Sequence, residues 1–280
     1  MAWIQPRSVA EAVELLQQRR ARVVCGGTDL FVGGPARPLA PEQEDWLDVR
    51  RIPELCGARR TEEGLEIGAA VTAAQLWEEE TYRALPALQQ AAKIVGGWQI
   101  QNRASLGGNV ANASPAADMV VPLMAYRAKV RLAGASGERR MALQDFIRGP
   151  RMTALQEGEL IVSLIVPERM LGTAQVFLRH DQRAATDISI VSVALAAAVA
   201  GGEIAWASAA VGAAAARAYT LSEEEEQLWR GRLDAKAMAR LGALYAARSA
   251  PITDVRAGED YRRSLVDTYI QRAARTVLGQ

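Results

Sequence analysis

The segment that decides the fold runs Ala104-Ser105-Leu106-Gly107-Gly108-Asn109-Val110-Ala111-Asn112-Ala113-Ser114-Pro115-Ala116-Ala117-Asp118. Two adjacent glycines let the backbone approach a ligand closely and adopt a positive φ. Successive amides in such a segment can form a nest that binds a diphosphate. Polar side chains suited to phosphate and sugar groups accompany the glycines, namely Ser105, Asn109, Ser114 and Asp118. The segment therefore predicts a turn that binds a phosphate-containing cofactor.

A second glycine pair follows a short apolar run near the N-terminus, Val23-Val24-Cys25-Gly26-Gly27-Thr28-Asp29-Leu30. The run predicts a strand that leads directly into a glycine turn, where backbone amides again suit a diphosphate. Either pair alone is more typical of a tight turn than of a phosphate site. The chain lacks G-x-G-x-x-G after a strand, a P-loop and G-x-S-x-G, which disfavours a Rossmann site, a P-loop site and a serine hydrolase.

Composition narrows the possible classes further. The chain has 280 residues, which indicates one large or two modest domains, and its net charge of +1 gives no sign of nucleic acid or anionic membrane as a partner. Two cysteines and one histidine cannot supply a Cys₄ iron–sulfur cluster or a typical zinc site, so we expect no metal. We expect Cys25 to be a buried free thiol, although one disulfide with Cys56 is possible. Few cysteines, no signal peptide and no apolar stretch of membrane length make the cytoplasm the default location.

Local patterns predict the main elements. Capping boxes at Ser8, Thr72 and Ser222 predict helix starts. Pro86 predicts the start of a helix that Gly96-Gly97 ends. The predicted strands are residues 22–25, 46–49, 65–69, 130–132 and 160–166; residues 191–200 and 204–211 form a hairpin around Gly201-Gly202. A final helix covers residues 261–277, and a Pro-rich loop with Pro35, Pro38 and Pro41 separates the first two strands. A domain boundary is expected near residue 170.

Taken together, these segments resemble the FAD-binding medium subunit of molybdenum hydroxylases, the group of carbon monoxide dehydrogenase, nicotinate dehydrogenase and bacterial xanthine dehydrogenase. The matching stretches, in the family's order, are Gly26-Gly27-Thr28-Asp29-Leu30, Gln99-Ile100-Gln101-Asn102, Ser105-Leu106-Gly107-Gly108-Asn109, Ala113-Ser114-Pro115-Ala116-Ala117-Asp118, Arg148-Gly149-Pro150-Arg151-Met152-Thr153, Glu157-Gly158-Glu159-Leu160-Ile161, Arg183-Ala184-Ala185-Thr186-Asp187-Ile188-Ser189-Ile190-Val191 and Tyr261-Arg262-Arg263. The resemblance thus covers nearly the whole chain, which makes it far more specific than either glycine pair.

The resemblance implies an α+β fold. A two-lobed FAD-binding domain of the vanillyl-alcohol-oxidase (PCMH) type would occupy residues 1–170, with lobes at about 1–55 and 56–170. A smaller C-terminal α+β domain with a short antiparallel sheet would occupy residues 171–280.

The resemblance also implies roles for individual residues. The diphosphate of non-covalent FAD would be held by Val23, Val24, Cys25, Gly26, Gly27, Thr28, Asp29, Leu30, Ser105, Leu106, Gly107, Gly108 and Asn109, with Ser114 nearby. Asp118 would bind cofactor hydroxyls, and Leu160 to Leu164 would border the flavin by backbone and apolar contact.

Arg179 replaces a lysine that the family often has near the flavin ring, and its positive charge would favour the anionic reduced flavin, although a guanidinium is not equivalent to an ammonium. His180 lies outside both glycine segments, so we expect no covalent attachment of FAD through it. The cysteine count excludes the additional iron–sulfur cluster of the hydroxybenzoyl-CoA reductase branch.

The function implied is electron transfer within a molybdopterin-dependent hydroxylase. The chain would accept electrons from the [2Fe–2S] clusters of a small subunit, beside a large molybdopterin subunit, in a heterotrimer or its dimer. It would pass them to NAD or another acceptor such as a quinone, and no side chain of its own would act as general acid or base. The alternatives are a stand-alone flavin oxidase of a small molecule and a non-catalytic scaffold subunit. The organic substrate would bind in another chain and cannot be inferred from this sequence.

Overall fold

The computed structural model describes residues 2–30, 32, 44–183 and 186–280. The predicted Pro-rich loop, and Ala184-Ala185 of the late family motif, lie outside the described residues.

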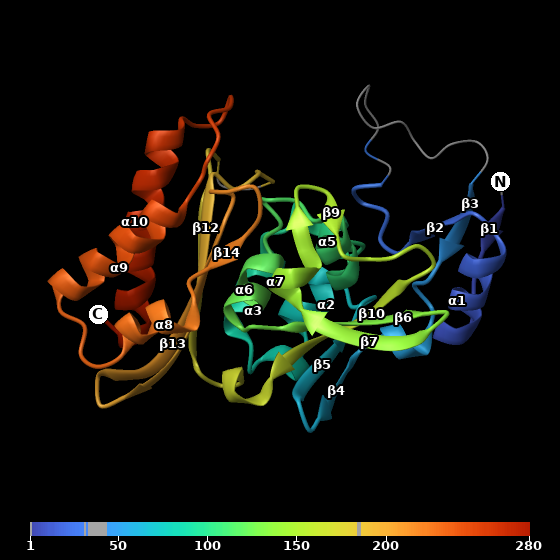
Figure 1. The fold of residues 1–280 in the computed structure, drawn as a ribbon, viewed down its shortest axis with the longest axis horizontal. Helices are drawn as coiled ribbons and strands as arrows, with labels where there is room; N and C mark the ends of the chain where they lie inside the picture. Colours follow the sequence, from blue (N-terminus) through green and yellow to red (C-terminus); the bar gives the residue numbers. More distant parts are fainter. Residues whose placement is uncertain (1, 31, 33–43, 184–185) are drawn as a thin grey trace.

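The chain begins with a small parallel sheet covered by one helix, at the right of Figure 1. Strands β1 (Trp3–Ile4), β2 (Ala21–Val24) and β3 (Asp45–Asp48) pair in the order β1-β3-β2, and α1 (Val9–Gln18) precedes β2. Ser8 caps α1 by accepting a hydrogen bond from the amide of Glu11, as predicted. The second hydrogen bond of the predicted capping box, from the amide of Ser8 to the side chain of Glu11, is not formed. The Glu11 carboxylate accepts from the amide of Arg7 instead.

A five-stranded antiparallel sheet follows, with the order β4-β5-β10-β6-β7. Its strands are β4 (Ala58–Thr61), β5 (Gly64–Gly68), β6 (Lys129–Gly134), β7 (Gly137–Ala142) and β10 (Leu160–Pro167). The chain reaches β10, the central strand, only after all the others, so the sheet closes around its last segment. Its register shifts between Ile161 and Ser163 where β10 pairs with β6.

Short helices fill the space between this sheet and the C-terminal part of the chain. They are α2 (Ala73–Glu78), α3 (Pro86–Lys93), α4 (Trp98–Gln101), α5 (Leu106–Asn112), α6 (Val120–Ala125) and α7 (Leu143–Phe146), together with the hairpin β8 (Ile147–Gly149) and β9 (Met152–Thr153). The capping box of Thr72 with Gln75 and the position of Pro86 at the start of α3 are both confirmed. One-turn 3₁₀ helices lie at Pro53–Leu55, Glu80–Tyr82, Glu168–Met170 and Gln227–Trp229.

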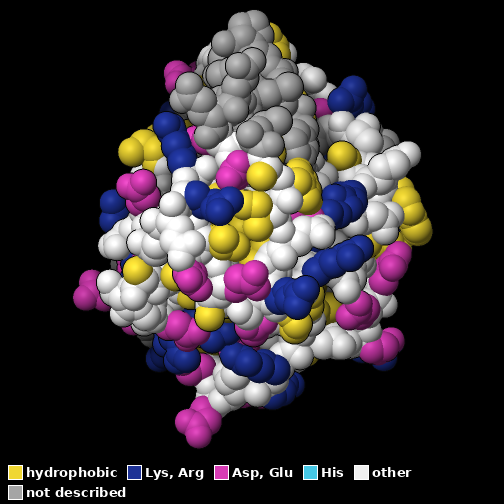
Figure 2. All heavy atoms as spheres, turned by 90° about the vertical axis from the view of Figure 1, so that its right-hand side faces the viewer, with side chains coloured by type: hydrophobic (Ala, Val, Ile, Leu, Met, Phe, Trp, Pro, Cys, Tyr) yellow, Lys and Arg dark blue, Asp and Glu magenta, His cyan; other side chains and the backbone are white. Residues whose placement is uncertain are grey.

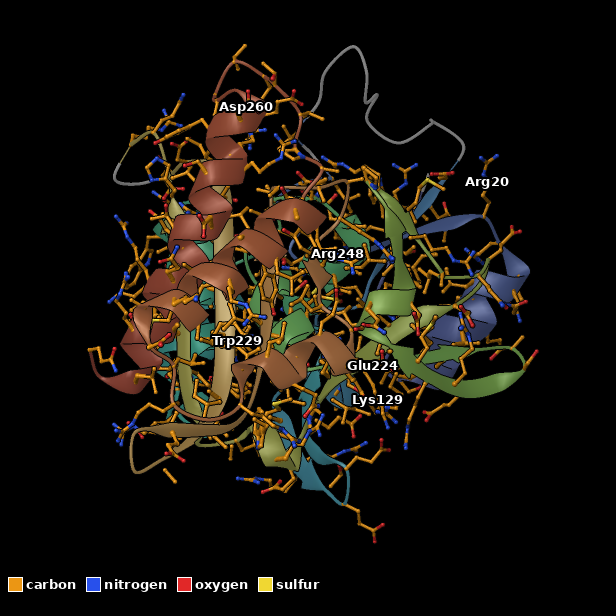
Figure 3. All side chains as sticks on the ribbon, turned by 60° about the vertical axis from the view of Figure 1, so that its left-hand side comes forward. Arg20, Lys129, Glu224, Trp229, Arg248 and Asp260 are labelled. Atoms are coloured by element: carbon orange, nitrogen blue, oxygen red, sulfur yellow. The ribbon has the colours of Figure 1, made fainter. Side chains whose placement is uncertain are left out.

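The C-terminal part consists of a four-stranded antiparallel sheet and two long helices. The strands β11 (Ala174–His180), β12 (Val191–Ala200), β13 (Glu203–Gly212) and β14 (Tyr219–Thr220) pair in chain order, and α8 (Glu223–Glu226), α9 (Ala235–Arg248) and α10 (Glu259–Leu278) follow. The predicted hairpin is confirmed, and Gly201 and Gly202 both have the positive φ that its tight turn needs. Figure 3 shows α9 and α10 over one face of this sheet, with Trp229 enclosed between them and the strands. The opposite face packs on α3 and α6.

Strand β10 contributes to two hydrophobic cores. Leu160 and Val162 pack with Ala12 and Leu47 of the first lobe, whereas Leu164 packs in the large core under the short helices. The two lobes of the first 170 residues therefore share one strand as a common wall. The predicted α+β fold is confirmed.

The surface that carries the first lobe has a mixed charge. Figure 2 shows lysine and arginine side chains interspersed with aspartate and glutamate over this face. No large region of one sign is visible there, which agrees with the net charge of +1.

Candidate cofactor site

The structure brings the two glycine segments into contact, as the sequence predicts. A Cβ atom on Gly26 would lie 1.9 Å from the carbonyl oxygen of Arg103 and 3.2 Å from the Cα of Ala104. Only a residue without a side chain allows this approach of one backbone to the other. The turn that follows β2 therefore packs directly against the backbone of Arg103 and Ala104, just before α5.

Cys25 and Ser105 add a side-chain contact at the same junction. Burial raises the pKa of the Cys25 thiol, and a hydrogen bond with Ser105 opposes this rise. The thiol is free, as expected, and the residue is half-buried. It stays protonated at neutral pH, and a neutral thiol beside a diphosphate avoids repulsion between two negative groups.

The available backbone amides belong to the first segment. Among the residues that the structure describes, the amides of Gly26, Gly27 and Thr28 donate no hydrogen bond. Gly27 has a φ of 73°, a left-handed conformation that glycine adopts without strain. These amides can therefore donate to a diphosphate.

The second segment differs from the predicted turn. Gly107 and Gly108 lie within the first turn of α5 and neither has a positive φ. The amides of Leu106 and Gly107 donate to the carbonyls of Val71 and Ala69 at 2.8 Å each. The prediction that successive free amides of this segment form a phosphate-binding nest is therefore wrong.

The serine of the second segment also has a different role. The Ser105 hydroxyl accepts from the amide of Gly108, so it caps α5 and is not primarily a phosphate donor. Ser114, a further predicted donor, instead accepts from the amide of Ala116. Gly108 is the exposed residue of this segment, but its amide is taken by Ser105, and a Cβ atom there would lie 2.8 Å from the Ser105 hydroxyl.

Arg151 joins the far ends of the two segments. Its guanidinium forms an ion pair with Asp29 at 2.8 Å and a hydrogen bond with the side chain of Asn112. Its own amide donates to the carbonyl of Ala113, the left-handed residue that ends α5. Asp29 is thus engaged in holding the loop against α5.

Two buried acceptors beside α5 have no partner in the described part of the chain. They are Oδ1 of Asn109 and Oδ1 of Asp118. A buried polar atom without a hydrogen bond is costly, so each indicates a donor that completes the site. Hydroxyl groups of a ribityl chain or a sugar are donors of the required kind, and FAD fits this donor set.

The other oxygen of Asp118 is bound to Arg179 at 2.9 Å. Burial raises the pKa of Asp118 to about 7, although the neighbouring Arg179 acts to lower it. The structure thus places two predicted site residues from distant parts of the chain in direct contact. Arg179 also reaches Asp181 at 2.8 Å and the carbonyl of Ile94 at 3.4 Å.

The apolar border expected from β10 is not available to a ligand. The side chain of Leu164 is completely buried in the large core and that of Leu160 lies in the core of the first lobe. Val24 is likewise a core residue, whereas Val23 and Leu30 are half-buried. The expected apolar contact through Leu160 and Leu164 is therefore wrong, and only their backbone is left for such a role.

His180 points away from the glycine segments. Its two ring nitrogens lie 3.1 Å from the hydroxyl of Tyr269 and 3.0 Å from that of Tyr261, both on α10. Side chains alternate along β11, so Arg179 and His180 occupy opposite faces. Both ring nitrogens are therefore engaged by hydroxyl groups of α10.

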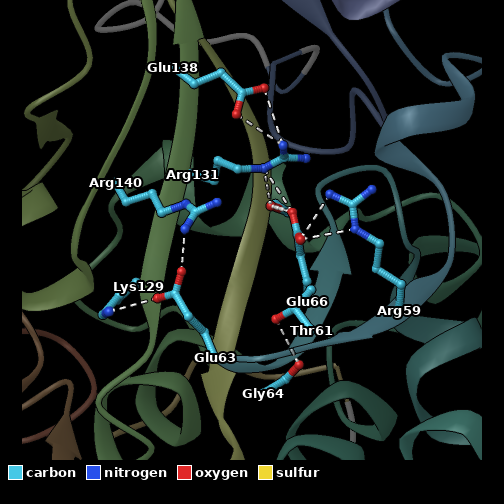
Figure 4. A network of polar contacts seen from close by, with 10 residues as sticks. Arg59, Thr61, Glu63, Gly64, Glu66, Lys129, Arg131, Glu138 and Arg140 are labelled. Atoms are coloured by element: carbon cyan, nitrogen blue, oxygen red, sulfur yellow. Dashed lines mark hydrogen bonds and ion pairs between the residues drawn. The ribbon is translucent and has the colours of Figure 1, made fainter.

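A groove with a volume of about 670 Å³ lies elsewhere, between α1 and the hairpin of β6 and β7. Its floor holds the charged network of Figure 4, in which Arg131 bridges Glu66 at 2.8 Å and Glu138 at 3.1 Å. Arg59 also pairs with Glu66. Glu66 and Arg131 are buried and satisfy each other, whereas the side chains of Arg59 and Glu138 are largely exposed.

Two residues at the site were missed by the sequence reasoning. Arg151 lies in a motif shared with the family, but no local pattern links it to Asp29. Asp181 follows Arg179 by two residues at the end of a strand, and this alternation could have placed both on one face.

Comparisons with known proteins place this chain in a family. The description "FAD binding domain in molybdopterin dehydrogenase" matches residues 1–169, and "CO dehydrogenase flavoprotein C-terminal domain" matches residues 177–277. The glyceraldehyde dehydrogenase medium chain of Sulfolobus acidocaldarius is 28% identical over 99% of this chain and 98% of its own length. The carbon monoxide dehydrogenase medium chain of Hydrogenophaga pseudoflava is 30% identical over 96% of this chain and 93% of its own. A solved structure of reconstituted CO dehydrogenase from Oligotropha carboxidovorans superposes with a TM-score of 0.93 at 27% identity, covering 100% of this chain and 98% of that one.

Among the described residues, no group of histidine, cysteine or carboxylate side chains could hold a metal ion. In the same part of the chain, no helix has the length and apolar character that a membrane span needs.

Proposed function

Because this chain belongs to the FAD-binding medium subunits of the molybdenum hydroxylases, we propose that it is the electron-transfer subunit of such a complex. FAD supplies the redox chemistry, since bound flavin exchanges electrons singly with iron–sulfur centres and in pairs with an acceptor. The protein supplies binding, orientation and electrostatics.

We assign the diphosphate to the contact between the two glycine segments. The amides of Gly26, Gly27 and Thr28 are available there, and Gly108 at the start of α5 is exposed. The ion pair of Arg151 with Asp29 holds the loop in place. Hydroxyls of the cofactor would complete the hydrogen bonding of Asn109 and Asp118.

The observation that carries this proposal is the coincidence of three features at one place. Two segments meet at Gly26 and Arg103, the amides of the first segment are free among the described residues, and two unpartnered buried acceptors belong to α5 and to the chain that follows it. Each feature alone has a structural explanation, but a bound dinucleotide accounts for all three.

The partners follow from the relatives. Medium chains of this kind are named for multi-subunit enzymes, such as carbon monoxide dehydrogenase. We propose that this chain assembles with a small [2Fe–2S] subunit and a large molybdopterin subunit, and that NAD or a quinone receives the electrons. Co-expression with candidate subunits followed by size-exclusion chromatography tests the assembly, and elution of this chain without them would count against it.

A titration of the full-length chain with FAD tests the cofactor assignment. We expect one FAD per chain, with a change in the flavin absorption spectrum on binding. Asp118→Asn should weaken binding about tenfold or more, because a charged acceptor of a buried hydrogen bond is replaced by a neutral one. Asp145→Asn is the matched control, since Asp145 is exposed on α7, and it should leave the affinity unchanged. Absence of FAD binding by the unmodified chain would refute the proposal.

A further inference from the structure

The charge of Arg179 is more than balanced in the structure. Its guanidinium lies between two carboxylates, with Asp118 at 2.9 Å and Asp181 at 2.8 Å. Only 4% of the Arg179 side chain is exposed, so solvent does little to screen these charges. With both carboxylates ionised, the three side chains carry a net charge of −1.

The strand geometry explains why Asp181 reaches Arg179. Arg179 is near the end of β11, and Asp181 follows His180 directly. Residues two apart on an extended chain project to the same face, so Asp181 lies beside the guanidinium that also binds Asp118. His180, between them, points to the tyrosines of α10.

This group of three side chains borders the candidate cofactor site. Asp118 uses one oxygen for Arg179, and its other oxygen is the buried acceptor without a partner in the described residues. Asp118 lies in the segment 113–118, which follows α5 directly. A cofactor that donates to Asp118 therefore experiences the charge of the whole group.

We propose that Asp181 is a positioning residue that fixes Arg179 and offsets its positive charge, so that the flavin site carries no net positive charge and becomes net negative when Asp118 is ionised. The proposal rests on the assignment of FAD to this site. It reverses the electrostatic effect expected from Arg179 alone, because the arginine no longer favours an anionic ligand. The expected consequences are a lower midpoint potential of the bound flavin and weaker binding of anions next to it.

The test uses Asp181→Asn in the full-length chain loaded with FAD. Asparagine has nearly the same shape and keeps an oxygen for the Nε of Arg179, but it removes one negative charge. Sulfite is a suitable probe, because it is an anion that adds to oxidised flavin. We expect the dissociation constant of sulfite to fall about tenfold or more, since a unit charge in a poorly solvated site changes an equilibrium by at least that factor. The midpoint potential, measured against reference dyes, should rise.

Two variants serve as controls for charge and geometry. Asp181→Glu keeps the charge and should retain sulfite binding and potential close to those of the unmodified chain. Glu168→Gln removes a charge from an exposed ion pair with Arg60 and should change neither quantity. Asp181→Ser removes the charge without the amide and should agree with Asp181→Asn, which keeps the test valid if one variant fails to fold.

The outcomes separate the two proposals. If the unmodified chain binds no FAD, the proposed function is refuted. If it binds FAD, but Asp181→Asn and Asp181→Ser leave both the sulfite affinity and the potential unchanged, only the role of Asp181 is refuted. A purely structural role would appear as lower stability of all three Asp181 variants without a change in either quantity, and this result would also overturn the inference.

Discussion

Replacing Gly26 with alanine is the most direct perturbation of the contact between the two glycine segments. The added Cβ would meet the carbonyl oxygen of Arg103 at 1.9 Å, whereas ordinary contacts begin at 3.4 Å. The obstructing atoms are backbone, so no side chain can turn aside. The φ of Gly26 is not in the left-handed region, so the expected effect comes from lack of space and not from a strained dihedral angle.

The magnitude follows from the forced separation. Overpacking by one methyl group in a closely packed region costs about 1–3 kcal/mol. Moving the loop away from Ala104 also displaces the amides that we assign to the diphosphate. We therefore expect Gly26→Ala to lower the free energy of unfolding by about 1–3 kcal/mol and to weaken FAD binding about tenfold or more.

Urea unfolding followed by circular dichroism gives the first quantity, and a fluorescence titration with FAD gives the second. Gly258→Ala is the matched control, because Gly258 has open space around its Cβ position and an ordinary φ. It should change stability by less than about 1 kcal/mol and leave FAD binding intact. If Gly26→Ala behaves like Gly258→Ala in both assays, the contact described here is not present in solution.

Three further predictions concern stability and pH. Ser105→Ala removes the cap of α5 on Gly108 and should lower the free energy of unfolding by about 1 kcal/mol, so an unchanged urea midpoint would contradict this role. The pKa of Asp118 is raised from 3.8 to about 7 in the folded chain, so without FAD its contribution to stability should fall by up to ~4 kcal/mol as pH rises from about 4 to 7. Asp118→Asn should flatten this part of the pH profile of the urea midpoint, and an identical slope in both proteins would show that Asp118 is not responsible. Arg262 is 1% exposed and bonds the carbonyl of Ile190 and the carboxylate of Asp254, so Arg262→Leu should cost about 3–5 kcal/mol and lower the melting temperature in calorimetry; a loss below about 1 kcal/mol would refute this role.

Much of the fold could be predicted because its elements have local signals. Thr72 with Gln75 and Pro86 mark helix starts, and Gly201-Gly202 marks a hairpin turn. These signals depend on neighbours in sequence. Short edge strands such as β1 and β4 carry no such pattern, and their pairing depends on strands elsewhere in the chain.

The second glycine segment shows why local reasoning fails at the site. Glycine and asparagine are poor helix formers, so residues 106–112 have the composition of a loop. The helix forms there because Ser105 caps it and because distant carbonyls of Ala69 and Val71 accept its first amides. Gly107 is small for the same reason, since a Cβ would lie 2.6 Å from that of Ala69. The sequence correctly singled out Gly107 and Gly108, but these positions need glycine for close packing and not for a positive φ.

The net charge around Arg179 could not be predicted from the sequence for a similar reason. Arg179 could be aligned with a family position, but its environment depends on Asp118, 61 residues earlier in the chain. The sign of the local charge is therefore a property of the folded site. The same limit applies to Leu160 and Leu164, whose place in the family motif did not reveal that their side chains face the cores.

The sharing of β10 between two cores has a consequence for synthesis on the ribosome. The first lobe lacks Leu160 and Val162 until the chain has been made to about residue 167, so its early helix and strands emerge with an unfinished apolar surface. Such surfaces are prone to aggregation while they wait for their partners. The apolar faces of α1 and β3 therefore lack this partner for most of the domain's translation, and Asp29 gains its ion pair with Arg151 only when the domain is nearly complete.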